Sequence, residues 1–289
     1  MRVIPASELV INADGTIFHL HLKPEQLADR VVLVGDPARV TAVASYFDTQ
    51  ECEVSSREFH TITGRYRGKR ITVVSHGIGT DNIDIVLNEL DALANIDFTT
   101  RTVRPVFRQL TLVRVGTSGG LQPFTPIGTY VAAEKSIGFD GVLYFYARTE
   151  EVRDLPFEAE LTRQLEWKLT GMYPYVVSAD PSLVEQIGKE DIVRGVTIAA
   201  NGFYGPQGRE LRLPLADAEL NRKIEAFRYG QYQITNFEME SSSLAGLSAL
   251  MGHRALTVCC IIAGRVNKNM NTDYKNSLND LIQKVLERI

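Results

Sequence analysis

Hydrophobic positions along the chain alternate between short unbroken runs and longer segments with a helical period. The runs at 31–34, 70–74 and 110–115 have the length expected of buried strands. A turn that contains glycine follows each run, and the first two turns lead into segments whose apolar residues recur at helical spacing. The same pattern predicts further strands at 193–199 and 255–262 and helices at 37–47, 83–94, 239–251 and 276–288.

The repeated order of strand, glycine turn and helix predicts an α/β fold. We expect a single domain over 1–289, with a central, largely parallel mixed sheet flanked by helices. Ligands of such sheets lie at the carboxyl ends of the strands, which is where the turns at 35, 77–79 and 116–120 are expected. The segment 95–109 is polar and has no period, so we expect it to be a surface insertion outside the sheet.

Composition narrows the class of protein. The 289 residues include 31 Lys and Arg against 35 Asp and Glu, for a formal net charge of −4, and 44% of them are hydrophobic. These values exclude a disordered chain and argue against a nucleic-acid binder, which would carry a basic patch. No signal-peptide pattern, no apolar stretch of roughly 18 residues and no disulfide framework among the three cysteines is seen. We expect a cytoplasmic protein with neither nucleic acid nor membrane as a partner.

Two arginines are candidates for binding an anion. Gly35 allows close approach to the backbone, Pro37 is suited to the first position of a helix, and Arg39 follows in that helix. The alternative is an ordinary turn with a solvated arginine. Arg114 lies inside an apolar run, where a charge requires either an internal carboxylate or a bound anion; both alternatives stay open. Thr117 and Ser118 are expected in the next turn, where they could serve the same anion, whereas the P-loop and dinucleotide fingerprints are absent.

Two further segments carry groups that suit a nucleoside. Phe203, Gln207 and Arg209 could recognise a flat polar ring, although a plain surface loop is the alternative. Met239 and Glu240 could hold a sugar, with helix capping as the alternative for the carboxylate. Three histidines, His60, His76 and His253, have no convincing partner spacing and are interpreted as structural or surface residues.

Eight short motifs occur in order along nearly the whole chain. They are Phe18-His19-Leu20, GDPARV at 35–40, Arg57-Glu58-Phe59, HGIG at 76–79, RVGTSGGLQP at 114–123, FYGPQGR at 203–209, FEMES at 237–241 and IIAGR at 261–265. Together they resemble the nucleoside phosphorylase-I family and, within it, the uridine phosphorylase branch. The resemblance implies a pentosyltransferase of pyrimidine salvage that converts uridine and phosphate reversibly into uracil and ribose 1-phosphate.

The resemblance also implies a role for each matching residue. The phosphate site would comprise Gly35, Arg39, Arg114 and Thr117, with Arg57 of a neighbouring subunit. Ribose would be held by Met239 and Glu240, with His19 of the neighbour. Uracil would contact Ser118, Gly119, Phe203, Gln207, Arg209 and Arg265, and Ile78 and Ile262 would form an apolar wall. Arg114, Gln207, Arg209 and Glu240 would carry the catalysis.

Assembly and cofactors follow from the same resemblance. Sites shared between subunits imply a homo-oligomer, at least a dimer, and many bacterial members form hexamers. No organic cofactor is implied, because phosphate is a co-substrate. Some members hold a monovalent cation at residues that match Glu58, Ile78 and Asn82, but the last of these is usually serine.

Three other classes of protein share part of this pattern. Purine phosphorylases and nucleosidases of the same fold resemble this chain up to a strand-end aspartate, which Ala263 replaces here. A non-catalytic nucleoside-binding protein would be expected to lack the arginines at the phosphate site. A dinucleotide-dependent dehydrogenase would fit the α/β pattern, but the glycine fingerprint that it needs is absent from this sequence.

Overall fold

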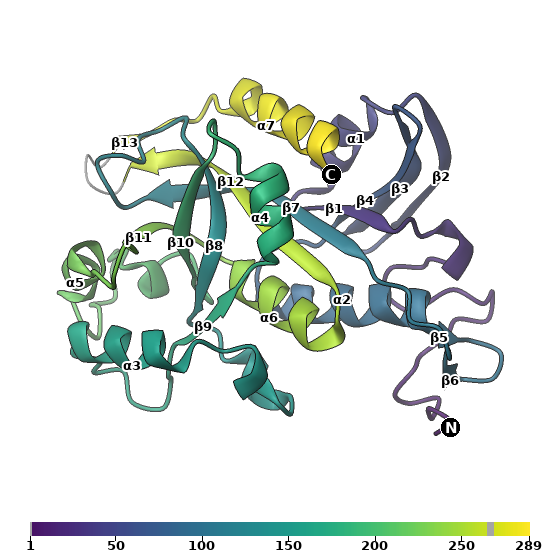
Figure 1. Ribbon diagram of the computed structural model, residues 1–289, viewed down its shortest axis with the longest axis horizontal. Coiled ribbons are helices and arrows are strands. Elements are labelled where there is room, and N and C mark those ends of the chain that lie inside the picture. Colours follow the sequence, from purple (N-terminus) through teal and green to yellow (C-terminus); the bar gives the residue numbers. More distant parts are fainter. Residues whose placement is uncertain (1, 265–268) are drawn as a thin grey trace.

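An eleven-stranded mixed sheet runs through the protein (Figure 1), of which the computed structural model describes residues 2–264 and 269–289. Its strands are β1 (Arg30–Val34), β2 (Thr49–Ser56), β3 (Phe59–Tyr66), β4 (Lys69–Ser75), β7 (Thr111–Gly120), β8 (Tyr130–Gly138), β9 (Tyr175–Ser178), β10 (Val193–Ala199), β11 (Ile234–Glu238), β12 (Arg254–Gly264) and β13 (Asn269–Met270). Their order is β13-β12-β8-β10-β11-β7-β1-β4-β3-β2, and β9 pairs with β8.

Parallel pairing occurs in two parts of the sheet: around β1 and β7, where the sequence has strong apolar runs, and around β10, which pairs in parallel with β8 and β11. Strand β1 pairs in parallel with β4 and β7, and β7 pairs in parallel with β12. Antiparallel pairs add β2 and β3 at one edge and join β12 to β8 and β11 to β7. Because β8, β10 and β11 connect β12 back to β7, this part of the sheet closes on itself as a distorted barrel. The predicted α/β fold with a central mixed sheet flanked by helices is confirmed, but parallel pairs do not predominate among the described strands, because β2, β3, β9 and β13 are joined to the sheet by antiparallel pairs.

Helices cover the sheet on both faces and at one end. They are α1 (Pro37–Ala44), α2 (Thr80–Asn95), α3 (Leu155–Gln164), α4 (Pro181–Ile187), α5 (Leu220–Ala226), α6 (Ser241–Met251) and α7 (Lys275–Arg288). The first apolar core contains residues of α1, α4 and α7, the second contains residues of α2 and α6, and the third lies beside α3 and α5. Figure 1 shows α1 and α7 on the side of the sheet opposite α2 and α6.

Strand β7 is longer than the sequence predicts. The segment 116–120 was expected to be a glycine turn after a strand ending at 115, and that expectation is wrong. The strand continues to Gly120, because β12 pairs with it along its whole length and β11 pairs with Gly119 and Gly120. Backbone pairing on both edges therefore outweighs the weak strand preference of glycine.

The segment 95–109 lies outside the central sheet. It forms a two-stranded sheet of β5 (Ile96–Asp97) and β6 (Thr102–Val103). From the connection between these strands, the Arg101 guanidinium donates to the carbonyl oxygens of Ile4 (2.9 Å), Pro5 (3.1 Å) and Leu9. The segment therefore anchors the N-terminal residues against the body of the protein.

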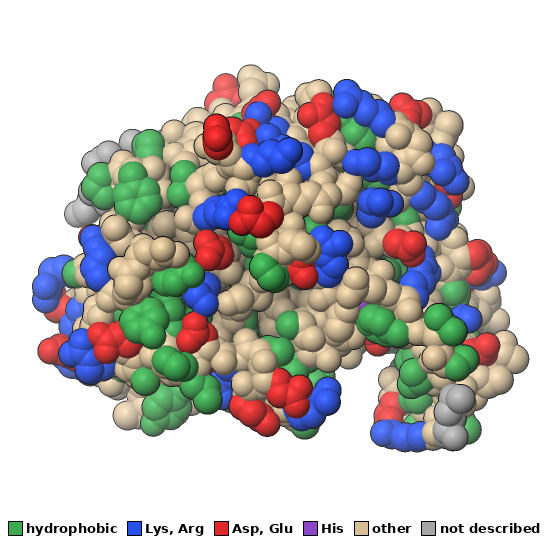
Figure 2. All heavy atoms as spheres, viewed as in Figure 1, with side chains coloured by type: hydrophobic (Ala, Val, Ile, Leu, Met, Phe, Trp, Pro, Cys, Tyr) green, Lys and Arg blue, Asp and Glu red, His purple; other side chains and the backbone are tan. Residues whose placement is uncertain are grey.

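The surface and the cysteines add two observations. On the face drawn in Figure 2, basic and acidic side chains lie close to one another. Within residues 2–264 and 269–289, no helix is both long and apolar enough to span a bilayer. Cys52, Cys259 and Cys260 are free thiols, and the last two are buried.

Candidate active site

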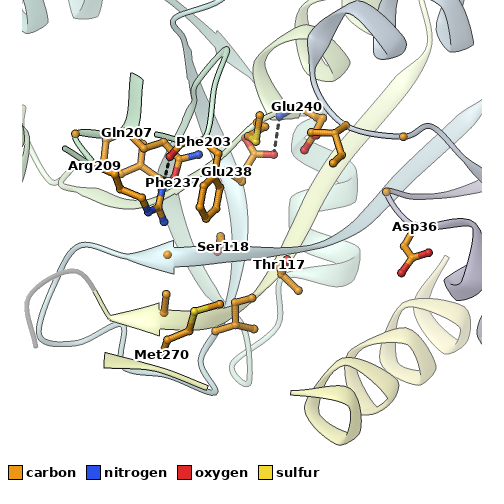
Figure 3. A pocket seen from close by; sticks show the side chains of 18 of the residues that line it. Asp36, Thr117, Ser118, Phe203, Gln207, Arg209, Phe237, Glu238, Glu240 and Met270 are labelled. Atoms are coloured by element: carbon orange, nitrogen blue, oxygen red, sulfur yellow. Dashed lines mark hydrogen bonds between the residues drawn. The ribbon is translucent and has the colours of Figure 1, made fainter. Parts of the chain in front are cut away.

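A cavity of about 1290 Å³ opens where β1, β7, β11 and β12 end. Most of the residues that the sequence assigns to a site line it: Gly35, Arg39, Glu58, Ile78, Asn82, Arg114, Thr117, Ser118, Gly119, Phe203, Gln207, Arg209, Met239, Glu240 and Ile262. Figure 3 shows Gln207, Arg209 and Phe203 at one end of the cavity and Asp36 at the other, with Glu238 and Glu240 between them. The carboxyl edge of the sheet is thus the location of the site, as expected.

The end of the cavity near β1 has the features of an anion site. Asp36 caps helix α1 by accepting a hydrogen bond from the Ala38 backbone N–H (2.9 Å), and Pro37 is the first helical residue, as predicted. Gly35 is closely packed, because a Cβ there would lie 3.3 Å from the Gly77 carbonyl oxygen. Arg39, half-buried in the first turn of α1, completes this end. Close backbone approach, a helix N-terminus and a guanidinium are the groups that bind phosphate.

Arg114 is buried and forms an ion-pair network at the cavity. Its Nη1 donates to Glu238 Oε2 at 3.0 Å, and its Nη2 donates to Glu240 Oε2. The guanidinium also contacts the Cys259 thiol, with 3.6 Å between Nη1 and Sγ. Of the two alternatives for Arg114, the internal ion pair is therefore present, and a contact with phosphate stays a prediction.

Burial and charge oppose each other in this network. Burial alone would lower the pKa of Arg114, but the charges of Glu240 and Glu238 outweigh it and raise that pKa. Burial also raises the pKa of Glu240, against the effect of Arg114, and the nearby Glu238 charge adds to the increase. The pKa of the Cys259 thiol is raised to about 12, mainly by burial, so the thiol stays protonated and unreactive at neutral pH.

Two residues of this network were not assigned to the site from the sequence. Glu238, the last residue of β11, accepts hydrogen bonds from the backbone N–H groups of Glu240 and Ser241 (both 3.0 Å), so it caps α6 while it pairs with Arg114. His76, interpreted as structural, is buried and its Nε2 lies 3.1 Å from Arg114 Nε. In the sequence, only the alternation Glu238-Met239-Glu240 indicates a role for Glu238, because this spacing can place both carboxylates on the same side of the chain.

The opposite end of the cavity brings together an aromatic ring, an amide and a guanidinium. The Arg209 Nη1 donates to Gln207 Oε1 and to the Phe203 carbonyl oxygen, both at 2.5 Å. Its Cζ lies 3.8 Å from the centre of the Phe203 ring. Gln207 is buried, and Asn221 donates to its carbonyl oxygen at 3.2 Å. This arrangement offers a flat face beside hydrogen-bonding groups, which suits a planar heterocycle.

Beside this end, β7 and β12 provide small side chains. Among the described residues, the Ser118 hydroxyl is buried and has no hydrogen-bond partner, and Gly119 adjoins it. Ala263 lines the same cavity, so no strand-end carboxylate is present at that position.

Glu58, Ile78 and Asn82 meet at the rim of the cavity. Gly77 has a φ of +74°, and a Cβ there would lie 2.4 Å from Asn82 Nδ2 and 3.4 Å from Glu58 Cγ. Ile78 is 73% exposed. No cluster of three or more His, Cys, Asp or Glu that could hold a metal occurs in residues 2–264 and 269–289. The monovalent cation stays a prediction.

His19 and Arg57 lie outside this cavity and near each other. The backbone N–H and Nδ1 of His19 contact the Glu89 carboxylate on α2, at 2.9 Å and 2.6 Å. Arg57, in the turn between β2 and β3, places its Cζ 5.6 Å from the centre of the Phe18 ring, which in turn packs against His19. Arg265, predicted to contact uracil, is outside the described residues.

Comparisons with known proteins show to which family this chain belongs. Residues 29–288 match the model of the phosphorylase superfamily. A uridine phosphorylase of Thermococcus kodakarensis is 30% identical over 258 residues, which cover 88% of this chain and 79% of that protein. A uridine phosphorylase of Haemophilus influenzae is 28% identical over 258 residues, 88% of each chain. The crystal structure of a Trypanosoma brucei nucleoside phosphorylase, described as showing uridine phosphorylase activity, superposes with a TM-score of 0.85 at 27% identity and covers 97% of this chain and 98% of that one.

Proposed function

Because this chain belongs to the phosphorylase superfamily, we propose that it is a uridine phosphorylase, which converts uridine and phosphate reversibly into uracil and ribose 1-phosphate. One observation carries the proposal: a single cavity joins an anion site at Arg39 and Arg114 to a heterocycle site at Gln207 and Arg209. The relatives that are named uridine phosphorylases support the same activity.

We assign each substrate of the proposed reaction to a part of this cavity. Phosphate lies at the end formed by Gly35, Arg39, Arg114 and Thr117. Uracil lies against Phe203, within reach of Gln207 and Arg209. Glu240 lies between the two ends (Figure 3), and Met239, the residue before it, also lines the cavity, so the sugar of uridine would lie beside these two residues. Glu240 accepts hydrogen bonds from the ribose hydroxyls, for which a carboxylate is suited.

The chemistry needs positioning and charge stabilisation. Phosphate is already a nucleophilic anion, so it attacks C1′ from the face opposite uracil without a general base. As the C1′–O bond to phosphate forms, the bond from C1′ to uracil N1 breaks and its electron pair moves into the uracil ring. Donors on Gln207 and Arg209 stabilise that developing negative charge, and a donor of this kind contributes about 3–4 kcal/mol to the transition state.

The positions of His19 and Arg57 support a shared site. Neither residue lines the cavity of its own chain, and both are at least partly accessible, so their side chains could contact the site of a neighbouring subunit. We propose at least a homodimer, in which these two residues complete the partner's ribose and phosphate sites. The free thiols suit a reducing compartment, and we place the enzyme in the cytoplasm.

A product assay tests the proposed activity. We expect uracil and ribose 1-phosphate in equal amounts from uridine, only when phosphate is present, and negligible turnover of inosine. Ala263 is the reason for the last expectation, because it cannot protonate a purine. Uracil release at the same rate without phosphate would identify a nucleosidase instead. Binding of uridine without any product would identify a non-catalytic binding protein.

A further inference from the structure

His76 follows β4 and is completely buried beside Arg114. Its Nε2 lies 3.1 Å from the Nε of Arg114. The guanidinium Nε always carries a hydrogen and never accepts, so the imidazole nitrogen must be the acceptor. The lone pair is therefore on Nε2 and the proton is on Nδ1, which fixes His76 as a neutral imidazole of one tautomer.

Each nitrogen of the Arg114 guanidinium has its own partner. Nη1 and Nη2 face Glu238 and Glu240, at the cavity, whereas Nε faces His76, which does not line the cavity. The group packs over Gly116, where a Cβ would lie 2.9 Å from Cζ. With Nε bound on one side and Gly116 beneath, the plane of the guanidinium is fixed, and its two Nη groups are directed to the cavity.

We propose that His76 is a positioning residue for phosphate binding: its neutral imidazole accepts the Nε–H of Arg114 and fixes the guanidinium in the orientation that phosphate requires. The proposal rests on the assignment of Arg114 to phosphate in the proposed function. The imidazole must be neutral to accept this hydrogen bond. A protonated imidazole would direct its own N–H at the Nε–H of Arg114 and would place two positive charges side by side.

The surroundings of His76 favour the neutral form. Burial lowers the pKa of His76 well below its usual value, and the charges of Arg114 and Arg39 lower it further. The Nδ1 atom is buried, and a hydrogen bond with the backbone of Gly77 acts on the pKa of His76 in the opposite direction, because it favours the protonated form. A histidine buried in this setting is better explained by the hydrogen bond that it accepts from Arg114 than by packing, for which an apolar side chain would serve.

Three substitutions of His76 distinguish a role as hydrogen-bond acceptor from a role in packing. His76→Gln can place an amide oxygen near the Nε2 position, His76→Asn places its polar end near Nδ1, and His76→Leu fills similar space with no acceptor. We expect the KM for phosphate to rise about tenfold or more in the Leu and Asn variants, because a hydrogen bond to a charged group is lost. The Gln variant should stay within about threefold of the wild type, and the KM for uridine should change little in all three.

Binding of inorganic phosphate, measured by calorimetry, tests the same order of affinities without turnover. This measurement therefore distinguishes the role of His76 from the proposed enzymatic activity. If the variants show the expected order of phosphate affinities but the protein does not cleave uridine, only the proposed activity is rejected. His253→Gln serves as the control, because it replaces another buried histidine, bonded to Asp91 and the Leu110 N–H, away from the cavity. Wild-type phosphate affinity in the Leu or Asn variant would overturn the proposal. Equal losses in all three variants, in phosphate affinity or in folding, would assign His76 a packing role and overturn it as well.

Discussion

Arg114 and Glu240 are bonded to each other, although one is assigned to phosphate and the other to ribose. Phosphate must therefore share the Nη2 group of Arg114 with Glu240, whose carboxylate also repels it. Ribose hydroxyls would draw that carboxylate toward the sugar. The pair thus links the two substrates through one buried contact.

This contact predicts that the nucleoside strengthens phosphate binding. We expect an unreactive uridine analogue to lower the Kd for phosphate by about tenfold, a typical coupling between sites. In Glu240→Gln, phosphate alone should bind more tightly than in the wild type, because a like charge is removed, while the analogue binds more weakly. Calorimetric titrations in both orders measure these changes. Weaker binding of both ligands in the variant would contradict the interpretation.

Removal of Arg114 should affect stability as well as catalysis. Arg114→Ala leaves Glu238 and Glu240 buried without their counter-charge, and breaking such a pair is expected to lower the free energy of unfolding by about 3–5 kcal/mol. Phosphorolysis should slow by about a hundredfold or more, with a sharply raised KM for phosphate. Urea unfolding and initial rates measure the two effects. Adding Glu240→Gln should recover part of the stability and none of the activity, and unchanged phosphate kinetics would exclude the assigned role.

Arg209 offers the opposite case, with a large effect on substrate and a small effect on the fold. Its guanidinium contacts Phe203 and Gln207 on a half-exposed segment, so Arg209→Ala should raise the KM for uridine about tenfold or more and lower kcat. The melting temperature should change by about two degrees at most. Arg212→Ala is the matched control, because Arg212 lies on the same segment and does not line the cavity. A collapse of the melting temperature with normal residual activity would make this segment structural.

The buried His76 predicts a loss of stability at acid pH. Its pKa is lowered well below the usual value by burial and by Arg114 and Arg39, whereas in the unfolded chain it is about 6.5. Above that pH both states hold the neutral imidazole and His76 contributes nothing to the pH dependence. Below it the unfolded chain binds a proton that the folded chain does not, so the free energy of unfolding falls by up to about 1.4 kcal/mol per pH unit until the folded pKa is reached.

Urea unfolding between pH 7.5 and pH 5 measures this slope. We expect a shallower slope in His76→Gln than in the wild type, because the proton uptake of the unfolded chain at that position is removed. His253→Gln is the control for the loss of a buried histidine. Identical slopes in the wild type and His76→Gln would show that His76 titrates alike in both states.

Mixed dimers test whether the subunits share their sites. Arg57→Ala and Arg114→Ala should each be nearly inactive alone. Co-expression should restore about a quarter of the wild-type activity, because half of the dimers are mixed and one of their two sites then combines an intact Arg57 with an intact Arg114. The specific activity of purified mixtures with separate tags gives the result. No recovery in verified mixed dimers would place Arg57 outside the partner's site.

Local signals in the sequence predicted the central part of the fold. The apolar run 31–34 forms β1, and the segment with a helical period at 83–94 lies in α2. Both could be predicted because the pattern that indicates a buried strand or an amphipathic helix lies within one short segment of the sequence. Strand β2 was not predicted, since its TQECEVSS sequence is mostly exposed at a sheet edge and lacks an apolar run. The strand character of 116–120 was also not predicted, because only pairing with distant strands reveals it.

Some residues of the candidate site could likewise be identified from the local sequence, and others could not. Gly35 and Arg39 could be identified locally, because strand, glycine and helix N-terminus are consecutive in the chain. The partners of Arg114 could not, since His76 is 38 residues away and Glu238 is 124 residues away in the sequence. Neither separation leaves a pattern in a single sequence. Only the pairing of β7 with β11, and with β4 through β1, brings these groups together.

Gly116 makes two positions of β7 depend on each other. A methyl group at residue 116 would come 2.6 Å from Nη1 of Arg114, so the guanidinium would have to move from the position in which it contacts His76, Glu238 and Glu240. A chain that drifts to alanine at 116 keeps its backbone ladder but displaces its anion-binding group. Selection acting on residue 114 therefore also acts on residue 116, and a library that randomises the pair together should return arginine only where it returns glycine.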